Sequence, residues 1–149
     1  MRRLVVICLV AAGTLAPLAA PAAAQELPHF PKASPPQPLP DPPCDAARPD
    51  GGDWVIGNWV GPQTRLRFTR TAEGIRWTLD RKGAGGEFGW QDGATLDGRV
   101  TAASACTLRL EAGGGAFVFD GVRTEDGRIY GFATNRAGAT VRFLLRRER

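Results

Sequence analysis

The residue types that carry most enzyme chemistry are scarce in this chain of 149 residues. The one histidine, His29, lies among prolines, and the two serines are Ser34 and Ser104. Nucleophilic catalysis needs a serine or thiol, a base and an orienting group in one place, and these residues do not supply that set. Paired carboxylates could in principle do acid–base work, but the acidic residues fall mostly at strand ends and turns. We therefore predict a protein that is not an enzyme and has no catalytic residues.

The first 24 residues have the pattern of a secretory signal. Arg2 and Arg3 precede an apolar run over residues 4–18, and small residues follow it. A membrane anchor is the alternative, but the run is short of the roughly 20 apolar residues that a span needs, and prolines interrupt it. We predict that residues 1–24 are removed and that the mature protein is periplasmic or secreted, with no transmembrane segment.

The cysteines favour export to an oxidising compartment. Cys8 belongs to the signal, which leaves Cys44 and Cys106 as an even pair in an exported protein. Such a pair favours a disulfide, worth on the order of 4 kcal/mol in the chain-entropy model. The alternative is a metal site, but two thiols and the distant His29 do not make a convincing zinc site. We predict the disulfide, no metal site and no cofactor.

Net charge says little about partners. The formal charge of +4 falls once Arg2 and Arg3 leave, because 17 basic residues then face 15 acidic ones. Export also argues against a nucleic-acid partner. The basic end over residues 146–149 is either a solvated chain end or a contact for anionic lipid.

Residues 25–43 contain eight prolines. Proline fixes φ and lacks a backbone donor, so neither a helix nor a central strand is expected there. The segment should be extended and semi-rigid. Two roles stay open: a linker, or a binding arm with Leu27, His29 and Phe30 as its distinctive side chains.

From Cys44 onward, short runs alternate apolar and polar residues, and glycine or aspartate separates them. In residues 64–70, for example, Leu66 and Phe68 face one way and Arg67 the other, as in half-buried strands. Asp-Gly pairs between such runs indicate tight hairpin turns. The expected strands are residues 53–61, 64–70, 75–80, 88–91, 95–101, 106–111, 116–122, 128–134 and 140–146. We predict an all-β domain over residues 44–149, a small antiparallel up-and-down barrel of about eight strands stapled by one disulfide.

Gly57 and Trp59 form a Gly-x-Trp arrangement in the first strand. This arrangement resembles the start of the lipocalin-like (calycin) barrels. In those proteins the first-strand tryptophan closes one barrel end, and an arginine from the last strand packs across its ring. The resemblance implies that Gly57, Trp59 and Arg147 close one end of this barrel.

The overall organisation of the chain also shows a weaker similarity to periplasmic inhibitors of secreted bacterial metalloproteases. These are small eight-stranded barrels with a signal peptide, one disulfide and a Gly-x-Trp near the barrel start. They place their N-terminal segment in the protease cleft. The similarity implies that residues 25–43 would be the inhibitory arm.

The barrel predicts binding rather than catalysis. The first hypothesis is a small apolar or amphipathic ligand in the barrel mouth, with Trp77, Phe88 and Trp90 as binding residues. Core packing is the alternative role of these aromatic side chains. The second hypothesis is a protein partner: a protease inhibitor or an envelope interaction module that uses the proline-rich arm.

Overall fold

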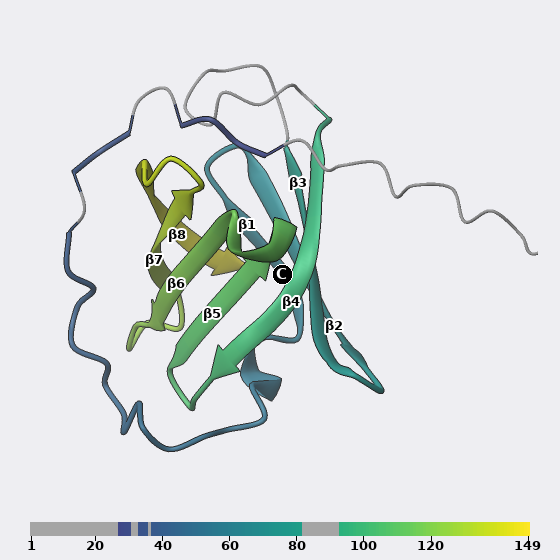
Figure 1. Cartoon of the computed structure of the whole chain (residues 1–149). Coiled ribbons are helices and arrows are strands. Elements are labelled where there is room, and N and C mark those ends of the chain that lie inside the picture. The colour runs from purple at the N-terminus through teal and green to yellow at the C-terminus, as the bar shows by residue number, and fades with distance from the viewer. Residues whose placement is uncertain (1–26, 31–32, 36, 82–92) are drawn as a thin grey trace, which may run out of the picture.

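The computed structural model describes residues 27–30, 33–35, 37–81 and 93–149. Eight strands close into a barrel in which each strand pairs antiparallel with its sequence neighbour and the last returns to the first (Figure 1). The strands are β1 (Gly57–Gly61), β2 (Thr64–Thr71), β3 (Gly74–Arg81), β4 (Thr95–Ala103), β5 (Thr107–Ala112), β6 (Phe117–Arg123), β7 (Ile129–Asn135) and β8 (Thr140–Arg147). The predicted all-β, up-and-down barrel is confirmed.

The predicted disulfide is also confirmed, between Cys44 and Cys106. It joins the end of the proline-rich segment to the chain just before β5, across 62 positions of sequence. The predicted signal peptide, residues 1–24, lies outside the described residues, as does the strand expected over residues 88–91.

The first strand begins later than predicted, whereas the other described strands agree to within two residues. Asp53–Val55 form a short 3-10 helix, η1, and β1 begins only at Gly57. Gly52 and Gly57 have φ angles of 69° and 122°, in the region that favours glycine, and they turn the chain at both sides of η1. A second 3-10 turn, η2 (Gly113–Gly115), connects β5 to β6.

The barrel interior is filled by the inward-facing side chains that alternation predicts. The indole nitrogen of Trp59 donates to the carbonyl of Val55 at 2.7 Å, and that of Trp77 donates to the carbonyl of Arg99 at 3.0 Å. The remaining space at the centre totals about 200 Å³, and none of it is wide enough for a water molecule. Its lining consists of Leu66, Leu79, Leu110, Phe117, Phe119, Phe143 and Leu145.

Two glycines make room for an aromatic ring in this core. Gly121 and Gly131 are partners across β6 and β7, and a Cβ built on either would fall within 2.7 Å of the Phe119 ring. The ring in turn meets Phe143 edge-on, with centroids 5.8 Å apart. Glycine is therefore required by close packing at both positions.

The proline-rich segment, called the arm below, packs into one end of the barrel. Phe30 is only 2% exposed, and its ring lies 6.3 Å from that of Phe117. The side-chain amide of Asn135 donates to the carbonyls of Pro28 and His29. Phe30 thus helps to close the barrel end where β6 begins.

The arm is fastened a second time at the start of β8. The backbone nitrogen of Ser34 donates to the carbonyl of Thr140, and the Thr140 hydroxyl donates back to the carbonyl of Ser34. From there the arm runs along the outside of the barrel toward Cys44, past β6, β7 and β8 (Figure 1). Neither open role, linker or binding arm, anticipated these contacts.

Candidate functional site

The outer face of β2 to β5 is charged, and most of its arginines are paired with carboxylates. The ion pairs on or beside these strands are Arg65–Glu148, Arg76–Asp97, Arg99–Glu73, Arg109–Glu111 and Arg109–Asp120. Such exposed pairs contribute little to stability, about 0–1 kcal/mol each. Their consequence is a hydrated face without an apolar surface for a ligand.

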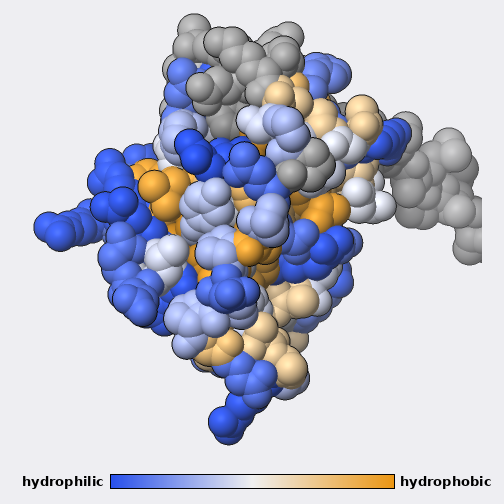
Figure 2. Space-filling view, turned by 90° about the vertical axis from the view of Figure 1, so that its left-hand side faces the viewer, coloured by the Kyte–Doolittle hydropathy of each residue, from blue (hydrophilic) through white to orange (hydrophobic). Residues whose placement is uncertain are grey.

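The outer face of β6 to β8 is different. Strand register places Val122 opposite Tyr130 and Tyr130 opposite Leu144, so an apolar row crosses three strands. Phe132, two residues along β7, meets Tyr130 edge-on with ring centroids 5.6 Å apart. Leu144 is 41% exposed, more than any other large hydrophobic side chain in the described part of the chain. Figure 2, which faces this side of the molecule, shows apolar patches interrupted by hydrophilic side chains.

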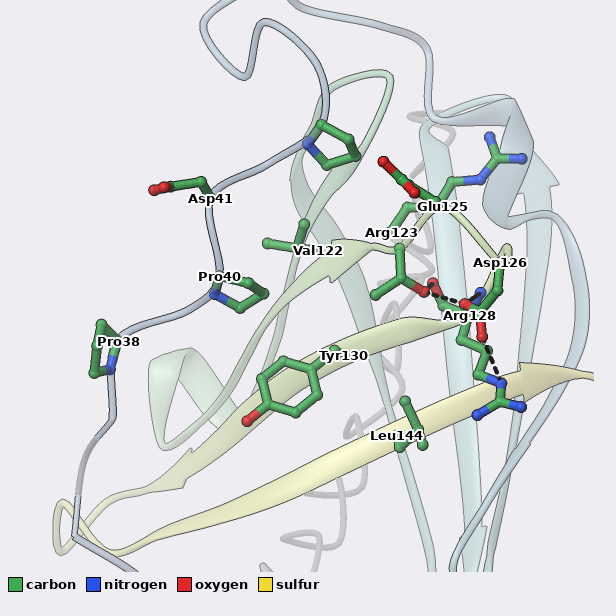
Figure 3. A pocket seen from close by; sticks show the side chains of 12 residues that line it. Pro38, Pro40, Asp41, Val122, Arg123, Glu125, Asp126, Arg128, Tyr130 and Leu144 are labelled. Carbon is green, nitrogen blue, oxygen red and sulfur yellow. Dashed lines mark hydrogen bonds and ion pairs between the residues drawn. The ribbon is translucent and has the colours of Figure 1, made fainter.

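The arm passes beside this row and forms a groove with it. Figure 3 shows Pro38 and Pro40 on the arm across from Tyr130 and Leu144 on the strands. The space between the arm and strands β6 to β8 measures about 760 Å³. This is the size of many small-molecule sites, which measure roughly 300–1,000 Å³.

Two further hollows adjoin this space. One of about 730 Å³ shares Tyr130 and Leu144 with it and extends to Phe132 and Arg142. A third, of about 340 Å³, shares Leu144 and reaches Arg146. The three together are called the arm groove. Its floor is the set Val122, Tyr130, Phe132 and Leu144. The arm forms its side wall with Ser34, Gln37, Pro38, Pro40, Asp41 and Pro43.

The charges at the β6–β7 turn, one end of the arm groove, are mixed, and two of them form an ion pair. Arg128 forms an ion pair with Asp126 at 3.0 Å. A hydrogen bond from the Thr124 hydroxyl, a second from the Arg128 backbone and the charge of Arg128 hold the pKa of Asp126 below its ordinary value. Arg123 lies over the Trp54 ring, 5.5 Å from its centroid.

The β8 side of the arm groove carries positive charge without partners. Arg142 and Arg146 alternate with Leu144 on the outer face of β8, because successive strand residues point to opposite faces. The side chain of neither arginine makes a hydrogen bond or an ion pair with any residue that the structure describes. The arm groove therefore combines an apolar floor with two unneutralised guanidinium groups.

The residues expected to close a barrel end do lie together. The guanidinium carbon of Arg147 is 4.9 Å from the Trp59 ring centroid, and its Nη1 donates to the carbonyl of Ile56 at 2.9 Å. A Cβ on Gly57 would fall 3.1 Å from that same nitrogen, so the glycine leaves room for the guanidinium group. This is the arrangement that the lipocalin-like resemblance implied.

Of the three residues expected to bind a ligand, the structure describes only Trp77, which is buried. Trp77 is 1% exposed and packs against Phe117, with ring centroids 5.9 Å apart. Phe88 and Trp90 lie outside the described residues. A ligand site at this barrel mouth stays a prediction.

Sequence reasoning missed the floor of the arm groove. The signal was present: Ile129, Tyr130 and Phe132 put large apolar side chains on both faces of β7. Phe143, Leu144 and Leu145 do the same on β8. An apolar residue out of phase with the alternation marks a surface that something covers.

Neither a metal centre nor a membrane helix is found in the described ranges. No three His, Cys, Asp or Glu side chains gather there closely enough to hold a metal ion. No helix among the same residues is long and apolar enough to cross a membrane.

The fold defines the class of protein: a closed, eight-stranded antiparallel barrel with one disulfide, similar in general shape to a lipocalin-like barrel. In comparisons with known proteins, no family model matches the chain, and no curated protein or solved structure matches it significantly.

Proposed function

We propose that this protein is an exported, non-catalytic binding module for a small apolar or amphipathic ligand, which it holds in the arm groove. One observation carries the proposal. The arm groove offers an apolar floor with several hundred Å³ of space, whereas the described barrel interior has no room for a water molecule. We therefore propose a ligand site on the outer face of β6 to β8 in place of the barrel mouth expected from the sequence.

The composition of the floor supports this use. Leu144 is exposed and Tyr130 is half-buried on a face where the neighbouring strands carry paired charges. Grouped apolar residues with a polar rim are typical of ligand grooves and interaction sites. The arm adds a second wall that is stiffened by proline, so little conformational entropy is lost when a ligand enters.

Export is part of the proposal. The Cys44–Cys106 disulfide fits an oxidising compartment such as the periplasm or the extracellular space. The small number of catalytic residue types favours binding over catalysis, and export argues against a nucleic-acid partner.

Titration with Nile red, a neutral dye whose fluorescence rises in apolar surroundings, tests the proposal. We expect saturable binding. Leu144→Ser should weaken that binding about tenfold, because roughly 1.5 kcal/mol of apolar contact is lost. Trp77→Phe serves as the control, because it alters the barrel interior and leaves the arm groove intact. A well-folded protein that binds no dye would contradict the proposal, as would binding that depends on Trp77 and not on Leu144.

A protein-binding role for the arm is the second candidate. The exposed prolines at positions 38 and 40 favour it, because they present an extended surface to solvent. Its protease-inhibitor form would require Phe30 to leave the core, since Phe30 is buried in the barrel end. Removing residues 25–43 should then abolish inhibition of a secreted metalloprotease. The barrel should stay folded with a lower free energy of unfolding, because the deletion also removes Phe30 from its core. Inhibition that survives the deletion would rule out the arm mechanism.

A further inference from the structure

We propose that the arm groove selects a single-chain amphiphile with an anionic head group. Its chain lies on Tyr130, Leu144 and Phe132, and its head group binds Arg142. This inference rests on the proposed function and specifies the chemistry of the ligand.

Arg142 lies next to the apolar floor of the arm groove. Register places Arg142 directly opposite Phe132 on the outer face, so its guanidinium group stands beside the aromatic part of the floor. Arg142 lines the same hollow as Tyr130, Phe132 and Leu144. A ligand chain on the floor would therefore bring one of its ends within reach of the guanidinium group.

The positive charge of Arg142 can be neutralised by a ligand. Arg142 has no acidic partner among the residues that the structure describes, whereas the arginines on β3, β4 and β5 at positions 76, 99 and 109 are each paired with a carboxylate. A guanidinium group presents its donors in a planar fork that matches carboxylate and phosphate oxygens. Ser34 and Gln37 on the arm line the same hollow and add polar groups near the head group.

The opposite end of the arm groove fixes the orientation of the ligand. Glu125, Asp126 and Asp41 line it together with Arg123 and Arg128, and Arg128 already pairs with Asp126. Because carboxylates outnumber guanidinium groups there, an anionic head group is less favoured at this end than beside Arg142. None of the described residues that line the hollow around Arg142 is acidic. An anionic amphiphile is therefore held with its head group toward Arg142 and its chain toward the β6–β7 turn.

The arm favours a free amphiphile over a membrane surface. Pro38 and Pro40 stand to one side of Tyr130 (Figure 3), so the arm forms a wall beside the floor that would keep a flat bilayer away from it. A single chain can lie lengthwise between the arm and the strands.

Calorimetric titration of the protein purified after export tests this inference. The probes are dodecanoate, 1-dodecanol and dodecyltrimethylammonium, which share a chain and differ in head-group charge, each below the concentration at which it aggregates. We expect dodecanoate to bind about tenfold more tightly than dodecanol, because one charge-assisted hydrogen bond contributes a difference of that size. The cation should bind most weakly.

Variants locate the head group. Arg142→Gln should remove most of the preference for dodecanoate over dodecanol, and Arg142→Lys should keep part of it. Arg67→Gln is the matched control. Arg67 lies on the outer face of β2 and has only a hydrogen bond to Asn58, so its loss changes net charge equally without touching the arm groove. Unchanged unfolding temperatures should accompany all three variants, because both arginines are exposed.

The outcomes separate the two proposals. Equal binding of dodecanoate and dodecanol, with both lost in Leu144→Ser, would overturn the anionic selectivity and leave the proposed function standing. Binding of neither probe would overturn both. A preference for dodecanoate that survives Arg142→Gln would overturn the assignment of Arg142. Arginine-dependent binding to anionic phospholipid vesicles without binding of monomeric dodecanoate would make the occupant a membrane surface and overturn the inference.

Discussion

Arg147, at the end of β8, lies across the indole ring of Trp59 in β1, with its guanidinium carbon 4.9 Å from the ring centroid. The two residues are also opposite each other in the ladder between the last and first strands. The same guanidinium group donates to the carbonyls of Ile56 and Trp54, which belong to the turn around η1. One side chain thus ties together the strand pair that closes the barrel and the η1 turn beneath it.

Replacement of Arg147 should therefore weaken the whole barrel. We expect Arg147→Ala to lower the free energy of unfolding by about 1–3 kcal/mol, because a cation–π contact and two hydrogen bonds are lost. Urea unfolding measures the change. Arg146→Ala is the control, since the side chain of Arg146 has no hydrogen-bond or ion-pair partner among the described residues and its loss should change stability by less than about 0.5 kcal/mol. Equal effects of the two variants would contradict the closing role of Arg147.

Phe30 should hold the arm against the barrel. Because its side chain is 2% exposed, Phe30→Ala would leave a cavity or release the arm, at a cost of up to about 3–5 kcal/mol. We expect the variant to be cleaved faster by proteases within the arm and to unfold at lower urea concentration. His29→Ala, at an exposed neighbouring position, should behave as the native protein. Unchanged cleavage and unfolding in Phe30→Ala would show that the arm is held by other contacts.

Gly131 should tolerate no side chain. A Cβ at this position would lie 2.3 Å from the carbonyl oxygen of Asp120 and 2.6 Å from the Phe119 ring. We expect Gly131→Ala to destabilise the protein by about 1–3 kcal/mol, since backbone and ring must both move. Gly51→Ala is the control, because the nearest atom to its added Cβ is 3.7 Å away. Thermal unfolding compares the two, and a neutral Gly131→Ala would mean that the ring can shift freely.

Asp126 should titrate below its ordinary pKa of 3.8, chiefly because the Thr124 hydroxyl donates to its carboxylate. A lowered pKa in the folded state means that the ionised carboxylate stabilises the β6–β7 turn above about pH 3.8. That contribution is lost as pH falls through the folded-state pKa. We expect Thr124→Val to raise the pKa of Asp126 toward 3.8 in a carboxyl-carbon NMR titration.

Thr134→Val controls for the loss of a threonine hydroxyl elsewhere on the barrel. It lies in β7, away from this turn, and should leave the Asp126 titration unchanged. A pKa of Asp126 that does not respond to Thr124→Val would assign the lowering to the Arg128 contacts instead.

Local patterns predicted most of the strands. The alternation of Leu66 and Phe68 with arginines placed β2 almost to the residue, and Glu73-Gly74 marked its turn into β3. The error at η1 has a local cause as well. Asp53-Trp54-Val55 has strand-like composition, but left-handed glycines on either side turn the chain there. The conformation of such glycines depends on the tertiary contacts of the turn. Here the indole nitrogen of Trp54 donates to the carbonyl of Ser104.

The candidate site was much less predictable. The pattern of residues 128–134 predicts a strand and nothing more, and the prolines of residues 25–43 predict only a linker or a binding arm. The arm groove exists only because the described residues of the arm, 34–35 and 37–43, lie beside β6 to β8. No pattern within the arm predicts which strands it will contact. The contact that fixes its course joins Ser34 to Thr140, 106 positions apart.

By itself, the sequence determined the all-β barrel and the Cys44–Cys106 pairing, because alternation and turn glycines act over a few residues and two cysteines allow one pairing. Only the tertiary structure decided that Phe30 closes a barrel end and that the arm forms a wall beside the row of Val122, Tyr130 and Leu144. The physical reason is that these contacts join distant segments, so their energies depend on how the closed barrel brings side chains together in space.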